Sequence, residues 1–381
     1  MKNNWHIHQL DVNNAFLHGD LDEEIYMKIP QGFAKEGDTR SKADHSLFIY
    51  DDKGIFVAAL IYVDDVILVG NDTTKIKQTK DDLDTQFSIK HLGNLKYFLG
   101  IEVVKTSEGL VLSQRKYTLD ILADCNFDGC RPSTFPIEKN HKLDQCEDAP
   151  KVDATCYRRL VGRLLYLQST RPDVTYSVNV LSQFVADPRQ PHMDAVYRVL
   201  RYLKTTVGQG VLLPRAGGFN LSAYCDSDWL GCPYTRRSRT GYILLLGGAP
   251  ISWKTKKQSV VSRSSAEAEY RSMASTVSEI LWVRWLLKDF NINSKEPTPL
   301  FCYNQAARHI ANNPVFHELT KHVEMDCYFV RERVESKEVL PCPIATTMQI
   351  ADLLTKRLGT QQLQFLLNKL GTRNLHARGG V

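Results

Sequence analysis

The longest apolar run in the chain is only ten residues long and ends in two adjacent carboxylates. It extends from Gly54 to Val63, and Asp64 and Asp65 follow directly. A membrane-spanning helix needs about 20 apolar residues, so this run predicts no membrane span. A second apolar run, Val66 to Val69, comes after the carboxylates. Two apolar runs joined by a short acidic tip predict a β-hairpin.

The length and composition are those of a globular protein with more than one domain. The chain has 381 residues, of which 43% are hydrophobic and 24% charged, which favours two or three folded domains over disorder. The N-terminal residues contain no apolar leader segment, and the nine cysteines include no CxxC pair. We therefore expect reduced thiols in an intracellular protein, cytoplasmic or nuclear rather than secreted.

Charge is unevenly distributed along the chain. Residues 1–130 contain 14 Lys and Arg against 21 Asp and Glu, whereas the remaining residues contain 34 against 22. A basic second part is typical of a protein that binds a polyanion such as nucleic acid. The alternative is that surface charge varies by chance.

Hydrophobic periodicity divides the chain into four segments. Residues 1–130 alternate short strands and helices, and residues 131–155 form a polar, Pro-containing linker. Residues 156–212 repeat apolar residues at helical spacing. Residues 213–381 read as three strands, a long helix, and then strands alternating with helices, which predicts an α/β domain with a mixed five-stranded sheet. The predicted fold class is therefore α+β and multi-domain.

The carboxylates Asp64 and Asp65 suggest a metal site. Like charges a few ångströms apart repel one another unless a cation neutralises them, and Mg²⁺ prefers carboxylates together with substrate phosphates. Asp11 closes the preceding strand and could join them, and three carboxylates at neighbouring strand ends can hold two ions for phosphoryl transfer. A solvated acidic turn is the alternative interpretation.

Several blocks in residues 1–173 resemble the reverse transcriptases of copia-type retrotransposons. The YxDD block contains Asp64 and Asp65, and the first palm block contains Asp11. The resemblance implies a polymerase palm with thumb-like elements, followed by connecting helices, and it implies that Asp11, Asp64 and Asp65 are catalytic metal ligands. The blocks are Gln9–Gly19, Tyr62–Asp65, Leu92–Ile101, Arg159–Gly162 and Thr170–Asp173.

The last segment resembles the RNase H domain that ends such polyproteins. The resemblance implies an RNase H-like α/β fold in which Asp226, Glu269 and Asp352 are catalytic and bind metal. The two-metal chemistry of such sites activates a hydroxide and polarises the scissile phosphate. The matching blocks are Tyr224–Trp229, Arg236–Ser238, Thr240–Tyr242, Ile251–Lys254, Ser264–Tyr270, Thr320–His322 and Gln349–Lys356.

Basic residues near these blocks are candidates for contacts with nucleic acid. We expect them to bind the phosphates of an RNA–DNA hybrid without reading the bases, so that binding weakens with salt. Solvated loops are the alternative. The residues are Lys254, Lys256, Lys257, Arg263, Arg236 and Arg237.

Three departures from the family pattern predict impaired activity. The chain begins just before the first palm block, without fingers residues in front of it. A SLYGLKQ-like block that family members place between the sequences around Arg40 and Ser41 is missing, so the palm is internally shortened near 40/41. Tyr303 stands where the family has an Asp that ligates metal, and a neutral phenol is a poor ligand for Mg²⁺.

The sequence thus predicts a retrotransposon-derived polymerase and ribonuclease H, a degenerate or truncated copy that is impaired in both activities. Its cofactor would be a pair of Mg²⁺ or Mn²⁺ ions, with no small-molecule cofactor beyond nucleotides. Its partners would be an RNA template or an RNA–DNA hybrid. Two alternatives remain: a non-catalytic module that binds RNA–DNA hybrids, and a translated relic without activity.

Overall fold

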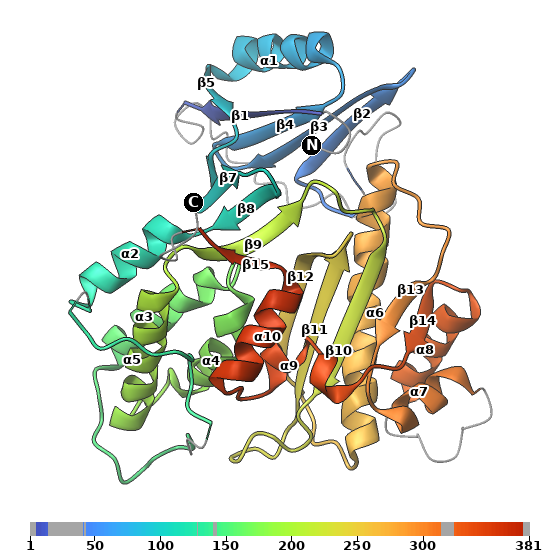
Figure 1. The fold of residues 1–381 in the computed structure, drawn as a ribbon. Coiled ribbons are helices and arrows are strands. Elements are labelled where there is room, and N and C mark those ends of the chain that lie inside the picture. The colour runs from blue at the N-terminus through green and yellow to red at the C-terminus, as the bar shows by residue number, and fades with distance from the viewer. Residues whose placement is uncertain are drawn as a thin grey trace, which may run out of the picture. The chain divides into compact units, whose positions relative to one another are not determined.

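The computed structural model describes residues 5–13, 41, 43–127, 129–139, 143–313 and 324–375. The chain divides into two compact units. Unit 1 comprises Met1–Val103 and Trp282–Asn293, and unit 2 comprises Val104–Leu281 and Ser294–Val381. Figure 1 gives the order of the elements along the chain.

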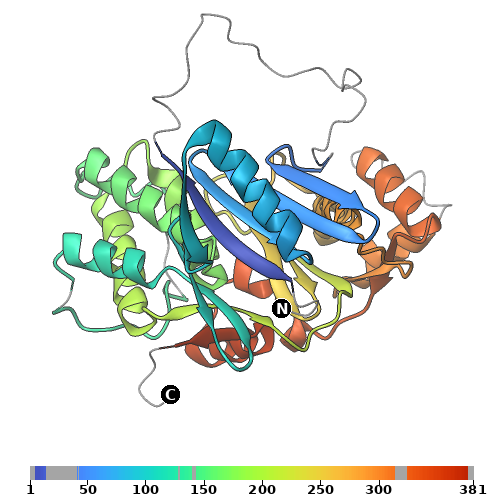
Figure 2. The same ribbon diagram turned by 90° about the horizontal axis from the view of Figure 1, so that it is seen from above.

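Unit 1 is built on a five-stranded antiparallel sheet with strand order β2-β3-β4-β1-β5. Helix α1 lies along one face of this sheet, as Figures 1 and 2 show. The hairpin β6–β7 follows β5. The elements are β1 (His6–Val12), β2 (Leu47–Asp52), β3 (Ile55–Tyr62), β4 (Asp65–Gly70), α1 (Thr73–Phe87), β5 (Ile89–Asn94), β6 (Tyr97–Phe98) and β7 (Ile101–Lys105).

Alternation of apolar side chains fixes which face of the unit 1 sheet is covered. Val66 and Leu68 on β4 are buried and pack with Leu10 of β1. Leu83 of α1 packs against the same cluster, so this face is the one that the helix covers. Helix α1 begins where the side chain of Asp72 accepts a hydrogen bond from the amide of Lys75, an ordinary N-cap. The predicted hairpin around Asp64 is confirmed, because β3 pairs with β4 in antiparallel register.

Unit 2 contains the mixed five-stranded sheet that the sequence predicted, in the order β12-β11-β10-β13-β14. The first three strands are antiparallel, and β10, β13 and β14 are parallel. A second group of strands pairs β8 with β9 and β9 with β15. The strands are β8 (Gly109–Ser113), β9 (Gln209–Pro214), β10 (Leu221–Ser227), β11 (Arg239–Leu246), β12 (Ala249–Lys257), β13 (Thr298–Phe301), β14 (Val339–Cys342) and β15 (Thr372–Asn374).

The helices of unit 2 follow amphipathic stretches of the sequence, and Pro172 opens α4 as the first helical residue. They are α2 (Arg115–Asp124), α3 (Ala154–Leu167), α4 (Pro172–Leu181), η1 (Ser182–Phe184), α5 (Gln190–Thr205), α6 (Ser265–Asp289), α7 (Gln305–Asn312), α8 (Glu324–Glu335), η3 (Thr346–Met348), α9 (Asp352–Thr355) and α10 (Thr360–Leu370). The last residues of α6 belong to unit 1.

One hydrophobic cluster joins the helices to the five-stranded sheet within unit 2. It contains Leu164 of α3, Leu200 of α5, Ile243 of β11, Leu354 of α9 and Leu366 of α10. The segments 156–212 and 213–381 therefore share a core in this structure. Burial of these side chains is the main stabilising term, since removal of a large aliphatic side chain from water contributes about 1.5–3 kcal/mol.

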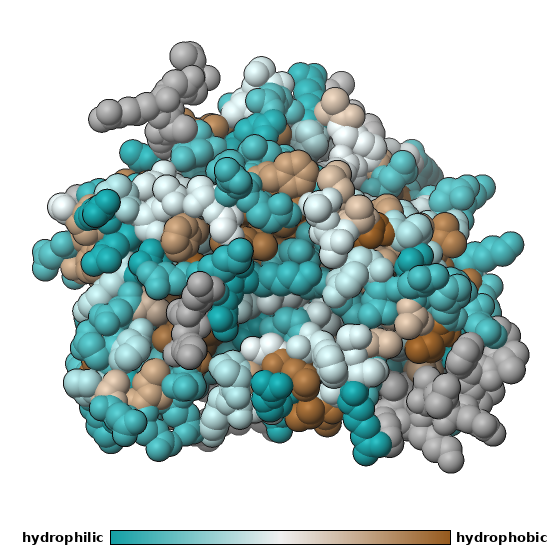
Figure 3. All heavy atoms as spheres, turned by 60° about the horizontal axis from the view of Figure 1, so that its bottom comes forward, coloured by the Kyte–Doolittle hydropathy of each residue, from teal (hydrophilic) through white to brown (hydrophobic). Residues whose placement is uncertain are grey.

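The described surface is mixed in polarity. In Figure 3 hydrophobic residues are scattered singly or in small groups among hydrophilic ones. None of the helices in the described part of the chain has the length and apolarity that crossing a membrane requires.

Candidate functional site

The β3–β4 hairpin of unit 1 places two of the candidate carboxylates at one end of the sheet. Its two-residue turn is Val63 and Asp64, with Val63 at a φ of 52°, and Asp65 begins β4. Strand β1 pairs with β4 so that Asp11 lies directly opposite Asp65. The amide of Val12 donates to the carbonyl of Asp64, with an N···O distance of 2.8 Å. The pairing therefore brings Asp11, Asp64 and Asp65 together.

A row of directly opposed residues crosses the sheet at this end. Tyr62 pairs with Asp65, and Asp65 pairs with Asp11. Asp11 also pairs with Lys90 of β5. Directly opposed residues in antiparallel strands point to the same face, and like charges so placed repel each other. Lys90 supplies one positive charge beside two carboxylates, so the row keeps a net negative charge.

One carboxylate oxygen of Asp64 is suited to bind a cation. Its Oδ1 is buried and has no hydrogen-bond partner in the structure. A buried carboxylate oxygen without a partner is costly, and Mg²⁺ takes oxygen ligands of this kind. The donor types therefore fit a divalent cation. Across the described ranges, however, no three His, Cys, Asp or Glu side chains already converge as a metal-binding group.

Unit 2 brings together the other three candidate carboxylates. Asp226 lies near the end of β10, Glu269 in the second turn of α6, and Asp352 at the first residue of α9. All three are buried, with exposed fractions of 0%, 1% and 6%. The segment before α9 is fixed by Gln349, whose side-chain amide donates to the carbonyl of Cys225 at 2.9 Å. The bond holds α9 close to the end of β10.

An ammonium group lies between two of these carboxylates. The Nζ of Lys356 is 2.6 Å from Asp352 Oδ1 and 3.3 Å from Asp226 Oδ1. The same nitrogen lies 5.0 Å from the ring centroid of Tyr303, a cation–π contact. Tyr303 also hydrogen-bonds to Glu269. Lys356 and Tyr303 thus contact all three carboxylates of this group, which we call the acidic centre (Asp226, Glu269 and Asp352).

Other protein donors bind the remaining oxygens of the acidic centre. The hydroxyl of Thr355 donates to Asp226 Oδ2. The amide of Ser227 donates to Glu269 Oε1 at 3.3 Å, and the thiol of Cys302 donates to Glu269 Oε2 at 3.7 Å. No set of three metal-ligating side chains converges anywhere in the described residues. In this arrangement protein donors satisfy the oxygens of the acidic centre.

Burial and the repulsion between carboxylates raise the pKa values of Asp352 and Glu269. Burial, and then the charge of Asp226, raise the pKa of Asp352 to about 6. The same two causes raise the pKa of Glu269 well above its usual range. Burial lowers the pKa of Lys356 and the two neighbouring carboxylates raise it, and the net shift is upward. Burial and the carboxylates also raise the pKa of Tyr303, so its phenol is neutral at pH 7.

The candidate nucleic-acid contacts lie in different places on unit 2. Lys254 and Lys256 are exposed on one face of β12 and line an open groove of about 640 Å³ together with Arg271 of α6. Lys257 is half-buried. The other three, Arg236, Arg237 and Arg263, are exposed. Exposed cations along a groove are suited to phosphate contacts.

The sequence analysis did not assign roles to Lys356 and Thr355. A signal was present, because Asp352 and Lys356 are four residues apart in a motif that resembles the family. Most of the first palm block and the junction near 40/41 lie outside the described residues, as do Thr320, Lys321 and His322.

A family model described as "Reverse transcriptase (RNA-dependent DNA polymerase)" matches the chain in two segments, residues 1–48 and 39–139. The Pol polyprotein from transposon RE1 of Arabidopsis thaliana is 40% identical over 96% of this chain and 27% of its own length. That of transposon TNT 1-94 of Nicotiana tabacum is 33% identical over 92% of this chain and 30% of its own length. The chain thus spans less than a third of these polyproteins.

A shorter relative is matched over its whole length. The putative transposon Ty5-1 protein of Saccharomyces cerevisiae is 30% identical over 71% of this chain and 100% of its own. The likeness to these transposon proteins runs through both units rather than through one motif alone. The chain belongs to the copia-type retrotransposon Pol family.

Proposed function

We propose that the chain is a Pol segment with a shortened polymerase palm and an RNase H-like domain. Residues 1–130 form the palm fragment with thumb-like elements, and residues 131–155 and 156–212 connect it to the RNase H-like residues 213–381. The strand order of the five-stranded sheet supports the second assignment, since three antiparallel strands precede two parallel ones. The family match, broken into overlapping segments 1–48 and 39–139, supports an internal shortening near 40/41.

In the palm fragment, Asp11, Asp64 and Asp65 would hold Mg²⁺. There the three carboxylates would place the positive charge of the ion beside the phosphates of an incoming nucleotide that is paired with an RNA template. Lys90 offsets part of the repulsion between Asp11 and Asp65, and Asp64 Oδ1 supplies an oxygen without a competing donor.

The acidic centre of the RNase H-like domain is proposed to be inactive as a nuclease. The observation that carries this is Tyr303, a neutral phenol that hydrogen-bonds to Glu269 and stands where the family has a metal-ligating Asp. The domain then holds RNA–DNA hybrids through Lys254, Lys256 and the neighbouring cations without cleaving them.

Cleavage of a labelled RNA–DNA hybrid by the full chain tests this proposal. The unmodified chain and the control Tyr303→Phe should be silent in Mg²⁺ or Mn²⁺, since neither supplies a carboxylate at that position. Tyr303→Asp should gain metal-dependent cleavage and bind Mn²⁺ at least about tenfold more tightly by calorimetry, because a carboxylate replaces a phenol. Asp226→Asn added to Tyr303→Asp should abolish both gains. If the unmodified chain cleaves at a rate that Tyr303→Asp does not exceed, the proposal is wrong.

Template-directed nucleotide incorporation tests the palm fragment. We expect none from the purified chain, because the segment that would cover the palm and contact the nucleotide is missing. Mn²⁺ binding should nevertheless weaken when Asp11→Asn or Asp64→Asn removes a carboxylate. Incorporation of nucleotides would contradict the assignment as an impaired polymerase.

A translated relic without a stable role is the second candidate. It predicts weak binding of hybrids that does not depend on Lys254 or Lys256. The binding module predicts an affinity that falls steeply with salt and falls again in the Lys254→Gln, Lys256→Gln double variant. Fluorescence anisotropy with a labelled hybrid separates the two, and a circular dichroism melt shows whether each variant is folded.

A further inference from the structure

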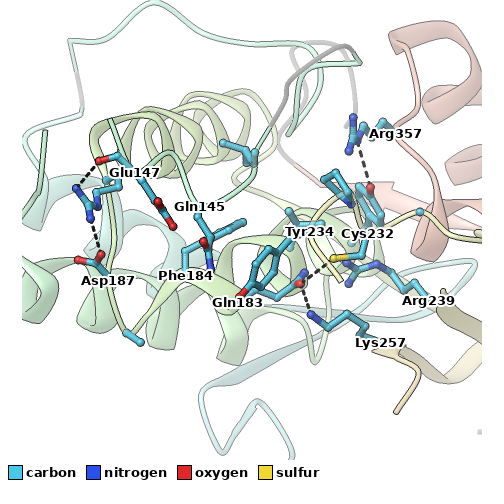
Figure 4. Close-up of a pocket in the computed structure, with 17 residues that line it drawn as sticks. Gln145, Glu147, Gln183, Phe184, Asp187, Cys232, Tyr234, Arg239, Lys257 and Arg357 are labelled. Atoms are coloured by element: carbon cyan, nitrogen blue, oxygen red, sulfur yellow. Dashed lines mark hydrogen bonds and ion pairs between the residues drawn. The ribbon is translucent and has the colours of Figure 1, made fainter. Parts of the chain in front are cut away.

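A pocket of about 470 Å³ opens in unit 2. Its wall combines residues of helix α4 and the turn η1, the loop between β10 and β11, and the residues after α9. Figure 4 shows Arg239, Lys257 and Cys232 gathered on one side and Glu147 with Asp187 on the other. The volume lies in the range of small-molecule sites, about 300–1,000 Å³.

Two cations are held side by side in this wall. Arg239 of β11 pairs directly with Lys257 of β12, so both side chains leave the same face of the sheet. Like charges in such a pair destabilise the sheet unless an anion lies near them. Lys257 Nζ donates to the amide oxygen of Gln183 at 2.7 Å. Because this amide is neutral, the bond does not neutralise the charge of Lys257.

Arg239 is buried, with an exposed fraction of 4%, yet one of its N–H donors makes no hydrogen bond. Its Nη1 donates to the side chain of Asn179, and its guanidinium lies 5.3 Å from the ring centroid of Tyr176. Its Nε has no hydrogen-bond partner in the structure, and the oxygen that forms its ion pair, Asp228 Oδ2, is 3.9 Å away. A buried guanidinium donor without a partner favours an acceptor that arrives with a ligand.

A third cation and an aromatic rim complete the pocket. Arg357 Nε donates to the hydroxyl of Tyr176 at 3.3 Å, which directs this guanidinium toward the same cavity. The carboxylate of Asp187 is engaged by Arg189 at 2.6 Å. Tyr234 lines the pocket and is 58% exposed, so its ring is available to a planar group.

We propose that this pocket binds a phosphate group, held by Arg239, Lys257 and Arg357, with Tyr234 beside the attached base. Guanidinium groups bind phosphate in a bidentate manner, and aromatic rings stack on bases. The phosphate can belong to a free nucleotide or to a nucleic-acid strand. The proposal does not depend on the proposed nuclease function, because neither the acidic centre nor a metal takes part.

Binding to the full chain is the test. Pyrophosphate and a nucleoside 5′-monophosphate are titrated by calorimetry, and a labelled single strand by anisotropy, each with EDTA present. We expect Lys257→Gln and Arg357→Gln to weaken binding at least about tenfold and the exposed control Lys295→Gln to leave it unchanged. Arg357→Lys should weaken binding less than Arg357→Gln, since it keeps the charge but loses the bidentate guanidinium. Circular dichroism melts confirm that the variants are folded.

Arg357 decides the outcome, because Lys257 is also proposed to contact the hybrid. If the free nucleotide binds and Arg357→Gln weakens it, the source is a free phosphate. If only the strand binds and Arg357→Gln weakens it, the source is the nucleic-acid backbone. If neither ligand binds, or if Arg357→Gln binds as tightly as the unmodified chain, the proposal is overturned.

Discussion

At the scale of single residues, the ion pair of Arg171 and Asp173 is the most fully buried charge pair of unit 2 described here. The two side chains are 1% and 0% exposed, and Nη2 lies 2.7 Å from Oδ2. The hydroxyl of Tyr202 donates to the same carboxylate at 2.7 Å. Arg171 Nη1 donates to the carbonyl of Thr206 at 2.9 Å. Buried charges are tolerated when they are paired and hydrogen-bonded in this way.

We predict that Arg171→Ala lowers the free energy of unfolding by about 3–5 kcal/mol, because it leaves Asp173 charged and unpaired in the core. Arg163→Ala is the control, since its partner Asp124 is 65% exposed and such pairs contribute at most about 1 kcal/mol. Urea denaturation measures both. Equal losses in the two variants would contradict the prediction.

Asp228 gives the stability a pH dependence. Burial raises its pKa to about 7, although Arg239 lowers it in part. In the unfolded chain an Asp titrates near about 3.9. Between about pH 4 and pH 7, Asp228 is deprotonated in the unfolded chain but still protonated in the folded one. The contribution of Asp228 to stability is therefore fully present below about pH 4 and is lost as the pH rises through 7.

Asp228→Asn tests this dependence, since the amide stays neutral and keeps an acceptor oxygen. We expect the unmodified chain to lose up to about 4 kcal/mol relative to the variant between pH 4 and pH 8. Urea denaturation at both pH values measures the difference. A constant difference between the two proteins would show that Asp228 does not titrate in this range.

At the scale of elements, Gly241 lets α9 lie against β11. A Cβ at this position would lie 2.6 Å from Thr355 Cγ2 and 2.9 Å from Leu354 Cβ. We predict that Gly241→Ala costs about 1–3 kcal/mol, because α9 would have to move away from the sheet. Gly162→Ala on α3 is the control, since nothing lies within 4 Å of its Cβ and Ala favours a helix. Thermal melts that show no loss for Gly241→Ala would contradict this account of α9.

Helix periodicity predicted several elements well and missed others. Helical spacing predicts the long helix over 262–290, and it spans Ser265–Asp289. The sequence offers Ser265 as a cap, but Ser264 holds that position, because its hydroxyl accepts from the amide of Glu267 at 3.1 Å. Adjacent serines give the same local signal, so only the backbone geometry distinguishes them. The predicted elements end at Arg357, although α10 buries Leu363, Leu366 and Leu367 at helical spacing.

At the scale of the whole chain, unit 1 is completed by residues far away in sequence. Phe290 lies with its ring centroid 6.0 Å from that of Phe56, and Leu286 packs on the same cluster as Phe56. Residues 1–130 alone lack these contacts, so we expect that they do not fold tightly by themselves.

We predict that Phe290→Ala in the full chain lowers the hydrogen-exchange protection of β2 and β3 about tenfold or more, equivalent to about 1.4 kcal/mol. Trp285→Ala is the control, because Trp285 is 59% exposed on the same helix. Amides of β10 and β11 should keep their protection in both variants. Equal loss throughout the chain would show that unit 1 does not open by itself.

The sequence alone determined the local features and the family. Alternation and helical spacing predicted the hairpin at Asp64 and the five strands of the mixed sheet of unit 2, because these signals depend on neighbours a few residues apart. The candidate metal-binding carboxylates were identified from motifs that resemble those of the family. Only the tertiary structure decided that Lys356 lies between Asp226 and Asp352, and that Arg239 is opposed to Lys257. The docking of α9 joins residues 130 positions apart, and the register of β15 on β9 joins Thr372 to Val211, and no local pattern specifies such pairings.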